Sequence, residues 1–122
     1  MRVIHTVAHA VQEGPSNATV ITRGGVAAYK TITEHFEVTL LMSVEELDAE
    51  ATAILFGAFD IAHTVYIESD QDLRVNLWGL EGNFIDISAG FPLAIVSVTG
   101  FDSVWLNNLG LSQATVRVVL GA

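Results

Sequence analysis

The chain of 122 residues contains no cysteine. A disulfide framework, a thiolate zinc site and a cysteine nucleophile are therefore all excluded. Basic residues are also scarce, because only five Lys plus Arg stand against 14 Asp plus Glu, and the formal net charge is −9 at pH 7. Such a surface repels phosphate groups and anionic lipid, so we expect neither nucleic acid nor a membrane as a partner.

Long apolar runs are missing too. The longest, residues 53–59, is far shorter than the roughly 18 residues of a membrane span, and the N-terminal sequence MRVIHTVAHAV lacks the continuous apolar segment of a signal peptide. We expect a soluble protein that is used in the cytoplasm or assembled there into a larger body.

Charged residues of both signs make up only 16% of the chain, whereas 51% of its residues are hydrophobic. About 25% charged residues is usual in a globular domain. The apolar surface left over predicts a homo-oligomer, for which we favour a trimer, or a protein that docks onto a larger body.

The second half of the chain alternates apolar and polar residues in short segments. This period of two is typical of strands with one buried face, and their regular spacing favours a sandwich over βαβ units. We therefore predict an all-β fold, a jelly-roll-like antiparallel β-sandwich, as a single domain over residues 1–122. The six segments are 64–69, 73–78, 83–87, 92–98, 103–108 and 114–120.

The first half predicts further strands at about 3–11, at 18–22, from about 27, and at 33–42. Arg23-Gly24-Gly25 is expected to form a turn. In residues 33–42, alternation puts the apolar side chains from Phe36 to Met42 on the buried face and the polar ones, His35 among them, outside.

One segment favours a helix instead. Ser43 and Glu46 have the spacing of a capping box, and apolar residues from Val44 onward recur at helical intervals. We predict a short amphipathic helix at about 44–56. The competing interpretation is a strand at 52–59, against which we weigh the good helix propensity of the alanines in this segment.

No residue pattern predicts catalysis, a metal site or a cofactor. His5 and His9 would lie about 13 Å apart on a strand, which is too far to share an ion. His35 and Glu37 are spaced like ligands in a cupin barrel, but a cupin needs a second histidine there; a small jelly-roll enzyme using these two residues remains an alternative.

Acidic residues that would suit a glycosidase pair are better explained as turn residues. They are Glu68, Asp70, Asp72 and Asp86, and the segment Ser69-Asp70-Gln71-Asp72 lies between two predicted strands. Aspartate and serine close such turns by bonding to the backbone.

An interface is the favoured role for the two tryptophans. Trp78 and Trp105 are expected to point outward, where an indole in so apolar a chain belongs to a subunit interface more often than to a sugar site. The last strand, 114–120, is apolar on both faces for part of its length. We expect it to be a central or an intersubunit strand, with Val116, Val118 and Leu120 as interface residues.

The run AHTVYIESDQDLRVNLWG at 62–79, the later VWLNN at 104–108 and the closing ATVRVVLG at 114–121 carry a resemblance. Their arrangement is similar to small β-sandwich virion proteins of tailed bacteriophages, such as capsid decoration (cement) proteins. The likeness covers about 62–122.

The resemblance implies a non-enzymatic virion protein that binds the assembled lattice of the major capsid protein, often as a trimer. A tail or neck component of the virion and a carbohydrate-binding β-sandwich module are the alternatives.

Overall fold

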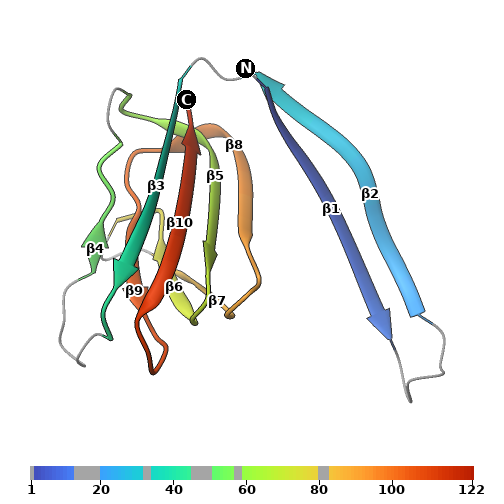
Figure 1. The fold of residues 1–122 in the computed structure, drawn as a ribbon. Helices are drawn as coiled ribbons and strands as arrows, with labels where there is room; N and C mark the ends of the chain where they lie inside the picture. The colour runs from blue at the N-terminus through green and yellow to red at the C-terminus, as the bar shows by residue number, and fades with distance from the viewer. Residues whose placement is uncertain (1, 13–19, 32–33, 45–50, 57–58, 80–82) are drawn as a thin grey trace. The chain divides into compact units, whose positions relative to one another are not determined.

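The computed structural model describes residues 2–12, 20–31, 34–44, 51–56, 59–79 and 83–122, and side chains from residue 34 onward (Figure 1). Within these residues the protein is all-β, and no helix is long and apolar enough to cross a bilayer. The chain divides into two compact units, Met1–Thr31 and Ile32–Ala122.

The first unit is an antiparallel hairpin of β1 (Arg2–Gln12) and β2 (Val20–Thr31). The expected turn at Arg23-Gly24-Gly25 is wrong, because β2 runs through it as one strand. The register shifts between Thr6 and Ala8, where two residues of β2 oppose one of β1. The β-bulge at Gly25 and Val26 therefore accommodates one of the two glycines that the sequence assigns to a turn, and Gly24 pairs with Ala8.

The second unit is a sandwich of two four-stranded antiparallel sheets. We expected one sandwich domain over 1–122, whereas both sheets come from this unit and β1 and β2 form a sheet of their own. The strands are β3 (His35–Met42), β4 (Thr52–Ala53), β5 (Ala62–Ser69), β6 (Leu73–Asn76), β7 (Ile85–Ile87), β8 (Leu93–Phe101), β9 (Trp105–Asn108) and β10 (Ala114–Gly121).

The strands pair in a nested order, in which the sandwich strands outermost in the sequence pair with each other and each inner pair follows in turn. One sheet has the order β3-β10-β5-β8 and the other has β4-β9-β6-β7. The first described strand of the sandwich thus pairs with the last, β4 pairs with β9, β5 with β8, and β6 with β7. Two further ladders, β10 with β5 and β9 with β6, join these pairs into sheets.

Alternation places the core between the two sheets. In β10, Ala114, Val116, Val118 and Leu120 are fully buried, while Thr115 and Arg117 are exposed. The interpretation of this strand as central is confirmed, because it pairs with both β3 and β5. Val116, Val118 and Leu120 are core residues that face the opposite sheet, so these three cannot contact another subunit.

The helix predicted at 44–56 is wrong where the structure describes it. Val44 and residues 51–56 are not helical, and 45–50 lie outside the described residues. Strand β4 pairs with β9, the amide of Ile54 donates to the carbonyl of Val104 at 2.9 Å, and Leu55 is exposed between the buried Ile54 and Phe56. Pairing with a neighbouring strand therefore outweighs local helix propensity.

We predict that Val118→Asp prevents folding of the sandwich. Val118 is fully buried and lies between Val38 and Ile67 on the flanking strands. An unpaired carboxylate at this position costs several kcal/mol, which is much of the stability of a small domain. Circular dichroism and thermal unfolding measure the effect. Leu111→Asp, at a 95% exposed position, is the control, and a folded Val118→Asp protein would contradict the strand's central placement.

Candidate functional site

Four segments meet at one end of the sandwich, the end drawn lowest in Figure 1. We call this the turn end and define it as residues 41–44, 69–72, 88–92 and 108–115. Backbone hydrogen bonds tie the segments together: the amide of Leu109 donates to the carbonyl of Asp72 at 2.8 Å, and the amide of Gly90 donates to the carbonyl of Ser69 at 2.9 Å. The turns therefore brace one another.

Asn108 is the side chain that joins most of the turn end. It is buried at the last position of β9, and its Nδ2 donates to the carbonyls of Met42, Ser43 and Ser112 at 3.1, 3.3 and 2.9 Å. Its Oδ1 accepts from the amide of Gly110 at 2.9 Å. One amide group thus holds the end of β3 against the connection between β9 and β10.

The acidic residues of the β5–β6 turn add to this bracing. Asp70 Oδ1 accepts from the amide of Thr115 at 2.8 Å, Asp72 Oδ1 accepts from the amide of Ala89 at 2.9 Å, and Ser69 Oγ accepts from the amide of Gln71 at 3.1 Å. These bonds confirm that Asp70 and Asp72 act as turn residues, and they extend that role to the neighbouring loops.

Asp86, the fourth acid of the suggested glycosidase set, is paired elsewhere. Its carboxylate accepts from Arg74 Nε at 2.8 Å and from Nη2 at 3.0 Å, and this hydrogen bonding lowers the pKa of Asp86. The Arg74 guanidinium also lies 3.8 Å from the centre of the Phe84 ring. The carboxylate is therefore held in a cross-strand ion pair.

The surface of the turn end carries large apolar side chains among exposed polar groups such as Asp70, Asp72 and Gln113. Phe91 is 69% exposed and Leu111 is 95% exposed, and three more large apolar side chains of the four segments reach solvent. No Lys or Arg occurs in the four segments. Exposed apolar side chains on a braced frame suit docking, because little conformational freedom is lost when they are covered. The other three are Leu41, Val44 and Leu109.

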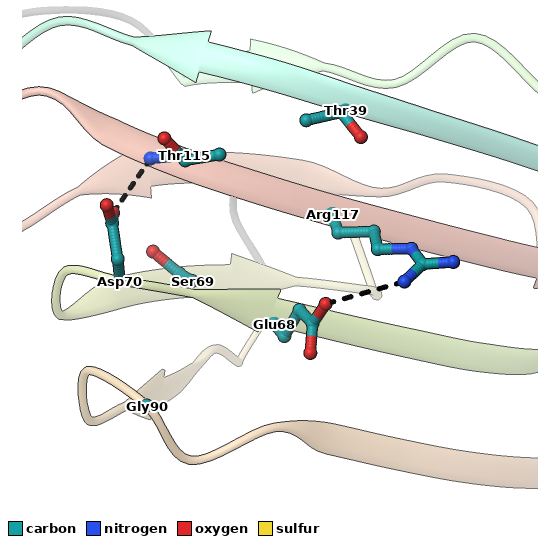
Figure 2. A pocket seen from close by; sticks show the side chains of 7 residues that line it. All are labelled: Thr39, Glu68, Ser69, Asp70, Gly90, Thr115 and Arg117. Atoms are coloured by element: carbon teal, nitrogen blue, oxygen red, sulfur yellow. Dashed lines mark hydrogen bonds and ion pairs between the residues drawn. The ribbon is translucent and has the colours of Figure 1, made fainter.

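An open depression of about 540 Å³ adjoins the turn end on the outer face of the sheet β3-β10-β5-β8 (Figure 2). Thr39, Glu68 and Arg117 line it from three adjacent strands, and Asp70 and Thr115 lie at its turn-end side. Arg117 Nε donates to Glu37 at 2.8 Å, and Nη1 lies 3.9 Å from Glu68.

The charged groups of this depression bond to one another. Tyr66 donates its hydroxyl proton to Glu68 Oε2 at 2.8 Å. This bond stabilises the protonated phenol and raises the pKa of Tyr66, while the hydrogen bond to Glu37 raises the pKa of Arg117. The row of ion pairs thus neutralises Arg117 and binds three strands together.

The structure places the histidine and glutamate candidates apart from any common centre. His35 is exposed at the start of β3, and Glu37 is bonded to Arg117. His5 and His9 lie on β1, in the part whose side chains are not described. Among the described residues, no three His, Cys, Asp or Glu side chains gather as a potential metal site.

The two tryptophans differ in their surroundings. Trp78 is 52% exposed just after β6, and its ring packs edge-on against Phe101 with centroids 6.1 Å apart. It lines a second depression, of about 510 Å³, together with Ile61, Thr99 and Asp102. Trp105 is only partly exposed, on the outer face of β9. The outward orientation predicted for Trp78 is confirmed, whereas its role in a subunit interface remains a prediction.

Sequence reasoning missed Asn108 and the turn end. Asn107-Asn108 ends a strand just before Leu109-Gly110, and a polar residue at an inward position two residues before a glycine was the available signal. Comparison with protein-family models finds no match for this chain, and neither does comparison with curated proteins.

We predict that Asn108→Ala destabilises the sandwich by about 2–3 kcal/mol, because it leaves buried carbonyls without their donor. Asn108→Asp keeps an acceptor for Gly110 but turns a carboxylate oxygen toward three carbonyl oxygens. It should therefore be the worse variant at pH 7, and should recover stability as the pH falls and the carboxyl group becomes a donor. Urea unfolding at pH 7 and pH 4 tests this. A stability of Asn108→Asp that does not rise on acidification would contradict the assigned donor role.

Proposed function

We propose that the protein is a non-enzymatic structural protein of a tailed-bacteriophage virion, a capsid decoration protein that binds the assembled shell. Its sandwich would be of the jelly-roll type, which is common in viral capsid proteins. Support comes from the nested pairing of β3 with β10, β4 with β9, β5 with β8 and β6 with β7, which describes one long hairpin rolled into two sheets.

The observation that carries the docking role is the turn end. It combines exposed apolar side chains with turns held by Asn108, Asp70 and Asp72. The bonds of these residues hold the loops in place, so the partner meets a preformed surface on which apolar side chains lie among exposed acidic ones. The proposed partner is the lattice of the major capsid protein, and the proposed location is the virion.

The acidic character of the chain shapes this binding. With a net charge of −9, attraction to a basic surface is screened by salt, whereas apolar contact is not. A lattice presents many copies of the site at fixed spacing, and an oligomer that engages several of them gains avidity. Binding to assembled shells should therefore be tight, resistant to moderate salt, and much stronger than binding to isolated capsid subunits.

We predict that the purified protein co-sediments with undecorated shells of its phage, and that the double variant Phe91→Asp/Leu111→Asp does not. Two carboxylates on an apolar contact surface lose their hydration when it is covered, which should weaken binding at least about 100-fold. Sedimentation of shells at low and moderate salt measures the bound fraction.

Leu55→Asp is the matched control, because Leu55 is 81% exposed and lies away from the turn end. It follows Ile54, whose amide bonds to Val104, and Val104 lies at the opposite end of β9 from Asn108. The Leu55→Asp variant should bind like the unchanged protein. Failure of the unchanged protein to co-sediment, or full release at moderate salt, would count against the decoration role and favour a tail or neck position in the same virion.

The depression around Trp78 favours a second candidate, a carbohydrate-binding module. One hollow is lined by the half-exposed indole of Trp78 and by the polar groups of Thr99, Asp102 and Ser103. This combination suits the binding of a sugar ring. If this is the function, immobilised polysaccharides should retain the protein, and Trp78→Ala should abolish retention while leaving the sandwich folded. A protein that no polysaccharide retards would dispose of this candidate.

A further inference from the structure

Charge is divided unevenly between the two units of the chain. The hairpin unit holds three of the five basic residues, Arg2, Arg23 and Lys30, and a single acid, Glu13, so its formal charge is +2. The sandwich unit holds the other two basic residues and thirteen acids, for a formal charge of −11. The hairpin is thus complementary in charge to the sandwich.

A two-stranded hairpin is at best marginally stable in water when it stands alone. In the described part of the chain, β1 and β2 pair only with each other. Both strands therefore keep an edge whose backbone donors and acceptors have no strand partner. A stable place for such a hairpin is against another protein surface, preferably one with an unpaired strand of its own.

The sandwich offers such a strand in β8. It lies at the end of its sheet and pairs only with β5 among the described strands. It has nine residues and none is charged, and the whole stretch 87–101 is free of charged residues. Its outer face presents Ala94 and Val96, and Val98 beyond them is 94% exposed.

The other sheet edges are protected in the ways that natural proteins use. Strand β3 carries the ion-paired Glu37 on its exposed face, β4 has only two residues, and β7 has three with the ion-paired Asp86 among them. Strand β8 has a bulge between Val96 and Phe101, where Ser97 Oγ accepts from the amide of Gly100. The preceding segment Leu93–Val96 is regular, and its outer edge, unpaired among the described strands, is open to pairing with another strand.

We propose that the basic hairpin of one copy docks along the β8 edge of a second copy. Strand addition supplies backbone hydrogen bonds, the apolar outer face of β8 supplies burial, and the acidic sandwich attracts the incoming hairpin. The inference does not rest on the proposed function, because copies would be linked in this way whether or not they bind a shell.

The contact joins two different surfaces, so each copy gives one hairpin and receives one. Such a head-to-tail contact either closes into a ring or continues as a filament. A ring of three is the smallest that would also satisfy the trimer expected from the apolar composition. Rotation about the ring axis would point the sandwich of every copy in the same direction along that axis, as a lattice-binding protein needs.

Charge variants at one exposed position test the proposal on the full chain. We expect light scattering to show an oligomer for the unchanged protein at low and moderate salt, and a mass that falls at high salt, since the attraction is then screened. Val98→Lys should weaken self-association about tenfold or more, because it sets a positive charge against a basic hairpin. Val98→Glu removes the same apolar group but should weaken it clearly less.

Leu55→Lys, at an 81% exposed position just after β4 in the other sheet, is the control and should leave the mass unchanged. The hairpin variant Arg23→Glu/Lys30→Glu should weaken self-association when the rest of the chain is unchanged. Combined with Val98→Lys, it should restore self-association. Circular dichroism establishes that each variant is folded.

The absence of cysteine allows a direct measurement of which surfaces meet. Copies carrying Ala10→Cys or Ala28→Cys in the hairpin, mixed with copies carrying Val98→Cys, should give a disulfide-linked dimer in higher yield than with Leu111→Cys. A monomeric unchanged protein, equal effects of Val98→Lys and Val98→Glu, or cross-linking of Val98→Cys mainly to itself would overturn the proposal.

Discussion

Everything in the sandwich depends on one strand, β10, being held between β3 and β5. Its inward residues Val116, Val118 and Leu120 fill the centre of the core, and its outward Arg117 ties the strands on both sides through Glu37 and Glu68. The ladder with β3 joins residues about eighty positions apart in the chain. Such non-local pairing requires a large loss of chain entropy before the contacts form, so folding should be slow and highly cooperative.

The polar groups of the turn end and its apolar surface have separate tasks. Asn108, Asp70 and Asp72 use their side chains to satisfy backbone groups of neighbouring turns, whereas Phe91 and Leu111 make few contacts within the sandwich and reach solvent. The first set fixes the shape and the second supplies the area that a partner can cover. This division separates the residues that hold the loops from those that the proposed partner would cover.

Strand alternation carried most of the fold that could be predicted from the sequence. All six strands expected after residue 64 are present with small changes of boundary, because period two reports directly on which face is buried. The helix predicted at 44–56 was wrong over the described residues 51–56, because its capping signal is local while the pairing of β4 with β9 is not. Alternation also cannot tell what covers a buried face, so Val118 was assigned equally to a core and to an interface. The bracing by Asn108 joins segments far apart in sequence, and no local pattern reports it.

The corner where β3 begins and β10 ends has a mechanical consequence. There the amide of Ala122 donates to the carbonyl of Glu34 at 2.9 Å, and Gly121 faces His35 across the ladder. A pull that separates these two points loads the bonds of an antiparallel pair one after another, because those bonds run perpendicular to the strands. The sandwich would unzip under weak tension in this direction. A force applied between the turn end and this corner would instead load whole strands along their length.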